Sequence, residues 1–455
     1  MSDSSFDASR RTFLQSTAAM TAAAAAMAAT EITPVAAQPA IEEEFRFAPN
    51  YDEAKVPDFE LPDPLMSADG GPVETAAEWP QRRTEIRAMV ERLMYGYIPE
   101  TMQGRIFHAE TLESSDDALG DMARRRQIRL FLTERRARPY VDLLIYLPKQ
   151  RPVATFLGLS FEGNASTTDD PAVLVPEWEA WQGKDARGQR GSQKNRWCFE
   201  PIIAAKMGSI TAHYYDIAPD FDEPDRARRR AEWYGDPTTV ESIPDDGAGA
   251  VAEWAWGLSR ILDYLETEPE IDADRIIVHG HSRLGKTSLW AGATDERFAG
   301  VIVNNSGAGG AAMSKRAFGE TVWRLNTSFP HWFCRNFRQF NNNESALPFD
   351  QHEVISLCAP RPVLVASAEK DEWADPRGEF LSMVFAEPVY MLLGGAGLAV
   401  PISHFENDGM PSLPPFEEPI NCGDLTYYIR HGVHDVTPYD WEQWIRFARR
   451  VVEEK

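Results

Sequence analysis

The chain has 455 residues, of which 43% are hydrophobic and 25% are charged, values typical of a globular protein with a large core. Its 70 acidic residues outnumber 46 lysines and arginines, which gives a formal net charge of −24. Because this acidity comes without a basic stripe or an aromatic-basic repeat, it argues against a nucleic-acid-binding protein. The acidity favours solubility and indicates no particular ligand.

The N-terminus predicts an export signal. Arg10 and Arg11 precede an alanine-rich apolar stretch that runs to about Ala29, a pattern typical of twin-arginine signals. Residues 35–37, Val-Ala-Ala, offer a cleavage site, so we predict a signal peptide over residues 1–37 and a periplasmic or secreted protein. The alternative is a membrane anchor, but alanine is weakly hydrophobic and the run is short, so we expect no stable membrane span.

The next segment, residues 38–78, is rich in proline and acidic residues and predicts an extended N-terminal arm. Helical patterning then begins near Trp79, where we expect the main folded domain, residues 79–455, to start. The length would allow about three domains, but α/β enzymes often keep one sheet over such a span. We therefore expect one domain with loop insertions. We also expect the protein to be a monomer.

Several elements are predicted in the first half of this domain. The apolar runs at residues 141–148 and 153–159 predict successive strands, and residues 210–215 predict another. Between them, residues 166–193 are polar and contain several glycines, which indicates a long loop insertion that would cover the functional site. Aromatic and leucine spacing over residues 254–265 predicts a buried helix.

The most informative segment follows at residues 275–286, where a β-branched run ends at Gly280 and a helical pattern begins after Ser282. This is how α/β-hydrolases mount a serine nucleophile. The glycine leaves room for a sharp turn, and backbone N–H groups at the helix N-terminus face developing negative charge. The spacing is G-x-S-x-x-G instead of the usual G-x-S-x-G, and the alternative role for Ser282 is a helix cap.

A serine of this kind needs a carboxylate and a histidine, which α/β-hydrolases supply later in the chain in that order. Residues 361–367 predict a buried strand, and an acidic loop follows it. We select Asp371 in this loop as the acid, with Glu369 and Asp375 as the alternatives.

The base is expected in a loop near the C-terminus. Residues 427–430 predict the final strand, and a loop containing His431 and His434 precedes a helix that begins near Pro438. The loop between last strand and last helix is where this fold places its base, and we select His434, with His431 as the rival. Together the elements predict an α/β-hydrolase fold: a three-layer α/β/α sandwich with a mostly parallel central sheet.

The chain resembles the glucuronoyl esterases, a family of carbohydrate esterases, and specifically its bacterial members. The resemblance rests on GHSRLGK at residues 280–286, which is similar to the family's G-C-S-R-x-G-K. Residues 347–352, residues 373–376 and the histidine loop before Asp440 add to it. It covers most of the chain from about Trp79 onward. The arginine and lysine after the serine make the first motif specific, because they are unusual among hydrolases.

The resemblance implies roles for individual residues. Ser282 would be the nucleophile, His434 the general base and Arg283 an oxyanion stabiliser that adds a charged donor. The alternative for Arg283 is an ion pair with a surface carboxylate.

Three further residues would contact the substrate. Lys286 corresponds to a lysine that hydrogen-bonds sugar hydroxyls, and Trp373 to a tryptophan that lines the uronate pocket. The alternative for Lys286 is a solvated helix lysine. Trp332, within residues 328–333, is expected to line the same pocket, without an assigned role.

One departure from the family pattern concerns the catalytic acid. Many members place a glutamate shortly after the nucleophile helix, just before a Ser-Gly pair, and this chain has Asn305 there. Asparagine carries no charge to hold an imidazolium. Some bacterial members are similar in using an acid after the later strand, so we interpret the substitution as a relocation to Asp371.

The implied activity is hydrolysis of esters of (4-O-methyl-)glucuronic acid, as in lignin-carbohydrate ester linkages of glucuronoxylan. The alternatives are an acetyl or feruloyl carbohydrate esterase with the same triad, or a non-catalytic glycan-binding relative. No metal or organic cofactor is expected. Four cysteines, Cys198, Cys334, Cys358 and Cys422, lie far apart without C-x-x-C metal spacing, and after export they would allow one or two disulfides of undetermined pairing.

Overall fold

The structure is a computed structural model that describes residues 49–102, 108–134, 136–137, 139–175, 189–221, 223–235, 239–400, 411–420 and 423–453. The predicted signal peptide and the beginning of the predicted arm lie outside the described residues. Nearly all described residues belong to one compact unit, Pro49–Val400 with Leu413–Lys455. None of the helices in this described part has the length and apolar character that a membrane crossing requires.

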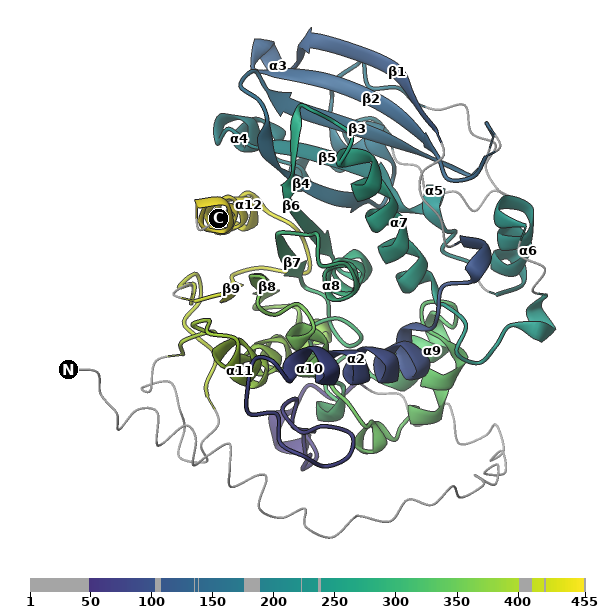
Figure 1. The fold of residues 1–455 in the computed structure, drawn as a ribbon. Coiled ribbons are helices and arrows are strands. Elements are labelled where there is room, and N and C mark those ends of the chain that lie inside the picture. Colours follow the sequence, from purple (N-terminus) through teal and green to yellow (C-terminus); the bar gives the residue numbers. More distant parts are fainter. Residues whose placement is uncertain are drawn as a thin grey trace. The chain divides into compact units, whose positions relative to one another are not determined.

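A nine-stranded sheet forms the centre of this unit, in the order β1-β2-β3-β5-β4-β6-β7-β8-β9 (Figure 1). The six strands from β5 to β9 pair in parallel, and β1, β2 and β3 extend the sheet by antiparallel pairing. This arrangement confirms the predicted α/β-hydrolase sheet. The strands are β1 (His108–Asp117), β2 (Ala123–Phe131), β3 (Tyr140–Pro148), β4 (Val153–Ser160), β5 (Gly208–His213), β6 (Ile271–His281), β7 (Gly300–Asn304), β8 (Val363–Ala368) and β9 (Leu425–Arg430).

Helices cover both faces of the sheet. Figure 1 shows α4 and α12 on one side, and α7 and α8 on the other. The helices are α2 (Trp79–Val90), α3 (Ala118–Asp121), α4 (Phe199–Ala204), α5 (Tyr214–Ile217), α6 (Glu223–Tyr234), α7 (Ala250–Leu265), α8 (Arg283–Thr294), α9 (Val322–Ser328), α10 (Gln351–Ser356), α11 (Pro376–Leu392) and α12 (Pro438–Glu453).

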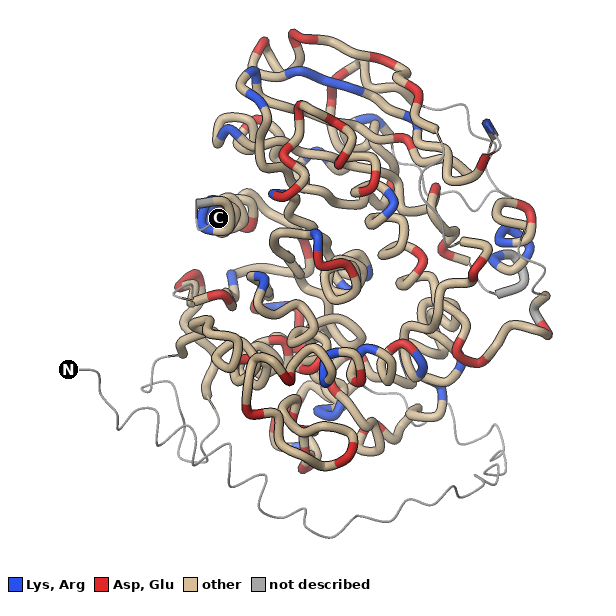
Figure 2. The backbone as a smooth tube through the Cα atoms, viewed as in Figure 1, with Lys and Arg blue, Asp and Glu red and all other residues tan. Residues whose placement is uncertain are grey.

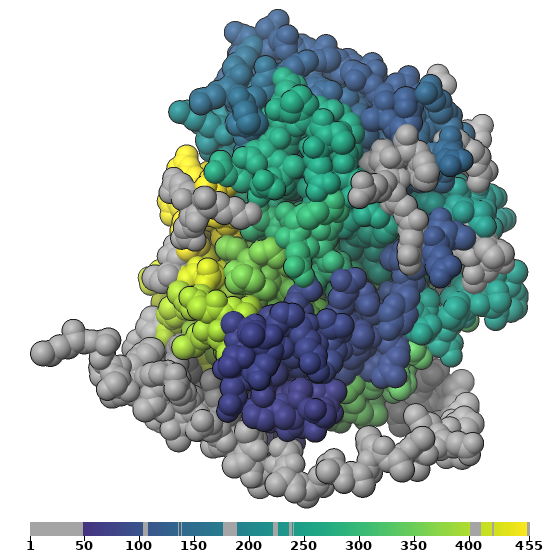
Figure 3. Space-filling view, viewed as in Figure 1, coloured from purple at the N-terminus to yellow at the C-terminus, as the bar shows by residue number. Residues whose placement is uncertain are grey.

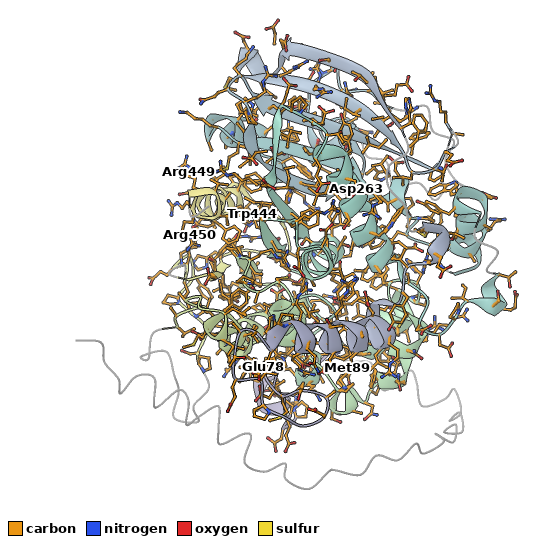
Figure 4. The ribbon with its side chains drawn as sticks, viewed as in Figure 1. Glu78, Met89, Asp263, Trp444, Arg449 and Arg450 are labelled. Carbon is orange, nitrogen blue, oxygen red and sulfur yellow. The ribbon has the colours of Figure 1, made fainter. Side chains whose placement is uncertain are left out.

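The C-terminal helix α12 is fixed to the sheet by a large hydrophobic cluster. Trp441 and Trp444 are buried with Phe156 of β4 and Ile277 of β6. Figure 4 shows Trp444 on the side of α12 that faces the sheet, whereas Arg449 lies on the exposed side. Truncating a buried tryptophan to alanine costs about 3–5 kcal/mol, so this packing holds the start of α12, and the loop before it, firmly in place.

Two of the sequence expectations for the fold need correction. The predicted strand over residues 210–215 ends at His213, because Tyr214 begins the short helix α5. The three thiols at Cys198, Cys334 and Cys358 are free, so none of them forms a disulfide. Cys422 lies outside the described residues.

The described residues before α2, residues 49–78, pack on the surface of this same unit (Figure 3). His352 Nε2 lies 2.8 Å from the Pro62 carbonyl, and Arg82 of α2 forms a 2.8 Å ion pair with the buried Glu353. The segment before α2 is therefore attached to α10 by direct contacts.

Acidic positions are scattered over the described chain, and a run of basic residues stands out on β2 (Figure 2). Arg125 pairs with Glu113 and Asp170, and Arg129 pairs with Asp142 at 2.7 Å. These carboxylates neutralise the basic run locally.

Candidate active site

Ser282 occupies a strained turn between β6 and α8. Its φ of 58° and ψ of −129° lie in a region that residues with a side chain rarely adopt. The turn requires glycine at position 280, because a Cβ there would lie 1.8 Å from the Leu284 carbonyl oxygen. The Arg283 backbone N–H is the first of α8 and has no intrahelical acceptor. This geometry is that of a nucleophile elbow, as the sequence predicts.

His434 and Asp371 form a hydrogen-bonded pair. His434 Nδ1 lies 2.6 Å from Asp371 Oδ2, and Asp371 is only 5% exposed. Since the carboxylate engages Nδ1, the other nitrogen, Nε2, is left to act as a base. The His434 ring lies 4.5 Å, between centroids, from the ring of His281, the neighbour of Ser282 in the chain. The pair is therefore brought to the elbow.

The two histidines beside the elbow on β6 are neutral structural groups. Burial lowers the pKa of His279 to about 3, and burial together with the neighbouring His434 lowers the pKa of His281 well below its ordinary value. His281 Nδ1 donates to the Asn304 side-chain carbonyl at 2.6 Å. Next to His434 there is thus an uncharged ring.

The alternative acids and base take other roles. His431 Nδ1 pairs with Glu369 at 2.8 Å, but these side chains are 60% and 32% exposed and form a surface pair. Asp375 caps the N-terminus of α11 and is bound by Arg316 at 2.8 Å. The geometry therefore favours the selection of Asp371 and His434 over these three residues.

Asn305, where the family resemblance leads us to expect a glutamate, directly contacts Asp371. Its side-chain amide donates to Asp371 Oδ2 at 2.9 Å, and the residue is buried. The same oxygen thus accepts from both Asn305 and His434. Hydrogen bonds to the charged form of a carboxylate favour that form. The sequence predicts the relocation of the acid but not this supporting contact.

Arg283 is held by a buried carboxylate that the sequence analysis missed. Its Nη1 pairs with Asp220 Oδ2, whose side chain is only 7% exposed, so the alternative of a surface ion pair is wrong in its location. Asp220 also binds His331 Nε2 at 2.6 Å and Trp332 Nε1 at 2.8 Å. Burial acts to raise the pKa of Asp220, but the contacts with His331 and Arg283 outweigh it and bring the pKa to about 2. Asp220 is therefore charged, and it fixes the guanidinium beside the elbow.

Lys286 is buried, and its ammonium group donates to three oxygens. These are the carbonyls of Ser306 and Ala308, each at 2.6 Å, and Glu320 Oε2 at 2.7 Å. An ammonium has three protons, so all of its donors are used. The alternative of a solvated helix lysine is therefore wrong, whereas the expected contact with a sugar stays a prediction. Lys286 also positions Glu320.

Trp332 is also more enclosed than the sequence analysis expects. One ring face stacks on Phe329 at 3.8 Å and 4°, and the Arg283 guanidinium carbon lies 4.8 Å from the ring centroid. Its indole N–H binds Asp220. Trp332 is 3% exposed, so its contacts serve to hold Arg283 and leave little surface for a ligand.

Trp373 lies on the 3-10 turn Glu372–Ala374, directly after Asp371. It is half-buried, and the Arg324 guanidinium carbon lies 5.7 Å from its ring centroid. Its backbone carbonyl accepts from the Glu320 N–H at 2.9 Å. Trp373, Glu320 and Lys286 thus form one cluster next to the loop of Asp371.

The residues missed from the sequence share one property: they are acids or amides in loops without a motif. Asp220 follows α5, Glu320 precedes α9, and nothing in their spacing relates them to Ser282. Only the Asn-Asn-Ser-Gly run at residues 304–307 offered a signal, through its similarity to the family pattern.

No cluster of three or more histidine, cysteine, aspartate or glutamate side chains suited to a metal ion occurs among the described residues. A cavity of about 590 Å³ lies between the β1–β2 turn and the insertion. Its lining includes Arg125, Asp170, Lys194 and Trp197 but neither Ser282 nor His434, so it is separate from the candidate active site.

Comparisons with known proteins agree with the geometry. The family model "Glucuronyl esterase, fungi" matches residues 203–394. Carbohydrate esterase MZ0003, from an unknown prokaryotic organism, is 44% identical over 415 residues, which are 88% of this chain and 91% of that protein. The 4-O-methyl-glucuronoyl methylesterase 1 of Wolfiporia cocos is 29% identical over 354 residues, 73% of this chain and 72% of that protein.

Comparison with a solved structure supports the same fold. The glucuronoyl esterase from Solibacter usitatus is 41% identical and superposes with a TM-score of 0.78, covering 88% of this chain and 99% of its own. The chain belongs to the glucuronoyl esterase family of carbohydrate esterases, within the α/β-hydrolase superfamily.

Proposed function

We propose that this protein is a serine esterase that cleaves esters of (4-O-methyl-)glucuronic acid, such as those joining glucuronoxylan side chains to lignin alcohols. The observation that carries the proposal is the pairing of His434 with Asp371 beside the strained Ser282 elbow, with the Arg283 guanidinium held next to it. Family membership supports the substrate class, since a relative is named a 4-O-methyl-glucuronoyl methylesterase.

The first chemical step forms an acyl-enzyme. Ser282 Oγ attacks the uronate carboxyl carbon while His434 Nε2 takes the hydroxyl proton. The C–O bond to the alcohol then breaks, and His434 returns the proton to the departing oxygen. Asp371 keeps His434 in the required tautomer throughout and stabilises its charged form.

The tetrahedral intermediate carries a negative oxygen that needs donors. The Arg283 backbone N–H at the start of α8 supplies one, and its guanidinium, fixed on one edge by Asp220, supplies charge. Fixing the group in advance avoids reorganisation during the reaction. Water then attacks the acyl-enzyme with His434 as base, which releases the free uronate and Ser282.

The sugar is proposed to lie toward Trp373. The half-buried indole offers a face that suits the apolar C–H surface of a pyranose, and Glu320, held by Lys286, lies in the same cluster. In this arrangement the sugar is the acyl part of the ester. In an acetyl or feruloyl esterase it would be the alcohol part.

Comparing two substrates tests the proposal. The protein should hydrolyse benzyl glucuronate with much higher kcat/KM than it releases acetate from acetylated xylan. The reverse order would place the sugar on the alcohol side and support an acetylesterase. Failure to cleave either substrate would support a glycan-binding role.

We also propose export by the twin-arginine pathway, on the basis of the arginine pair and the alanine-rich stretch at residues 10–29. Changing Arg10→Lys together with Arg11→Lys should retain the protein in the cytoplasm, as measured by cell fractionation. Unchanged export of this variant would contradict the proposed route.

A further inference from the structure

Glu379 on α11 is a fully buried carboxylate that the catalytic scheme does not use. It is 0% exposed, and it accepts four hydrogen bonds. Its Oε1 accepts from the Ser306 N–H at 2.7 Å, the Ser306 hydroxyl at 2.8 Å and the Gly307 N–H at 3.1 Å. Its Oε2 accepts from the Ser367 hydroxyl at 2.6 Å. Three of the four hydrogen bonds thus come from the short turn after β7.

This turn has contacts on two sides of the active site. On one side, the Asn305 amide donates to Asp371 at 2.9 Å. On the other side, the Ser306 carbonyl accepts from Lys286 at 2.6 Å, and the same ammonium holds Glu320 at 2.7 Å. A movement of the turn would therefore displace both the acid of the triad and the cluster that faces the sugar.

We propose that Glu379 is a positioning residue for the esterase reaction, which fixes the Asn305–Gly307 turn and, through it, both Asp371 and the Lys286–Glu320 pair. The inference rests on the proposed function, because it takes Asp371 as the acid of the triad. Glu379 acts only through these other residues.

Few charged groups lie near the Glu379 carboxylate. Asp371 faces it from the loop after β8, Tyr427 from β9 and Asp375, paired with Arg316, from the start of α11. Burial raises the pKa of Glu379 to about 7, the serine hydrogen bonds oppose this rise, and Asp371 adds to it. A proton on Oε2 can be donated to Ser367, so Oε1 remains an acceptor for the turn in both protonation states.

Two substitutions separate the hydrogen bonds from the charge. Glu379→Gln keeps an acceptor oxygen for Ser306 and Gly307 but removes the charge, whereas Glu379→Ala removes both. For benzyl glucuronate, E379A should lower kcat and raise KM, with a combined loss of roughly 100-fold in kcat/KM, since a small displacement of catalytic groups has such an effect. E379Q should retain most of kcat, and the acid limb of its pH profile should stay at its wild-type position, because Glu379, with a pKa of about 7, already carries a proton over most of that limb.

A matched control lies on the same helix. Glu387 of α11 is buried and accepts from the Ala399 N–H at 3.2 Å, away from the turn. Glu387→Gln should leave kcat, KM and the pH profile unchanged. Rates are expressed per folded molecule, with folding checked by circular dichroism and thermal melting, so that lost stability is not counted as lost catalysis.

A double-mutant cycle tests the route of the effect. If Glu379 acts by holding Asp371, then Asp371→Asn should reduce kcat by a smaller factor in E379A than in the wild type. Equal factors in the two backgrounds would overturn the proposal, as would an E379A enzyme with wild-type kcat and KM.

If E379A does not fold, Glu379→Asp decides, because the shorter side chain draws the carboxylate away from Ser306 and Gly307 while keeping its chemistry. A folded E379D with wild-type kcat and KM would assign Glu379 to fold stability only and overturn the proposal. Failure of the proposed function would look different, because the wild-type protein itself would then not cleave benzyl glucuronate.

Discussion

Asn305 donates a hydrogen bond to Asp371, with 2.9 Å between Nδ2 and Oδ2, on the same carboxylate oxygen that His434 contacts. The residue at the family's usual acid position thus contacts the carboxylate that we propose as the acid. The two positions are adjacent in space, because β7 and β8 are parallel neighbours and both loops leave their carboxyl ends. Relocation of the charge therefore preserves its place beside the histidine.

Replacing the acid should impair turnover without affecting folding. Asp371→Asn removes the charge that holds the His434 tautomer, and we expect kcat for a uronate ester to fall about 10³- to 10⁴-fold, as in other triads. Glu369→Gln, on the same loop, is the control and should retain wild-type kcat. A large loss in E369Q together with normal rates in D371N would show that the surface pair with His431 is the catalytic one.

The asparagine should not tolerate conversion to an acid. Asn305→Asp places a second carboxylate within hydrogen-bond distance of Asp371. Two carboxylates this close share one proton at lower pH, and they repel each other when that proton is lost at higher pH. The loss in kcat/KM should therefore be larger at pH 8 than at pH 6. Asn305→Ala, which removes the donor without adding charge, should show a loss independent of pH over this range. The same pH dependence in both variants would contradict the assignment.

Asp220 should matter for catalysis through Arg283. Asp220→Asn removes the charge paired with the guanidinium and weakens the contacts with His331 and Trp332. We expect kcat/KM to fall by roughly 10²-fold, the scale of one misplaced oxyanion donor. The variant Arg283→Lys should show a comparable loss, since lysine lacks the planar fork of donors. A D220N enzyme with unchanged kinetics would show that Arg283 does not need this anchor.

Glu379 should make folding stability depend on pH. Its pKa of about 7 in the folded protein exceeds its ordinary value of 4.5, so between these limits the folded state keeps a proton that the unfolded chain has released. This contribution to stability is present below about pH 4.5 and is lost as the pH rises toward 7. Urea unfolding at several pH values should therefore show a smaller decline for Glu379→Gln than for the wild type. Parallel declines would contradict the raised pKa.

The strands that are apolar throughout could be predicted from the sequence. Residues 141–148, 153–159 and 427–430 fall within β3, β4 and β9, and the predicted turn at Gly280 lies between β6 and α8. In contrast, β1 has the sequence HAETLESSDD and is largely polar, because it lies at the edge of the sheet. Strand β7 has only five residues. Neither pattern distinguishes a strand from a loop.

The site could be predicted where chemistry imposes a motif. Ser282, Asp371 and His434 follow from the order of strands and loops, and the structure brings the last two into contact. Lys286 shows the limit of such reasoning, since its place in the helix was expected but its burial among three acceptors was not. Asp220, Glu320 and Glu379 act through contacts between distant loops, which no local pattern encodes.

The most direct test of the account is the initial rate of benzyl glucuronate hydrolysis by the wild-type protein and by Ser282→Ala. The account predicts clear cleavage by the wild type and a loss of several orders of magnitude in S282A, with both proteins folded. Because the serine supplies the attacking oxygen, the loss should be about as large as that of other triad nucleophiles, on the order of 10⁶-fold. Hydrolysis by S282A at the wild-type rate would contradict the central claim that Ser282 is the nucleophile of a glucuronoyl esterase.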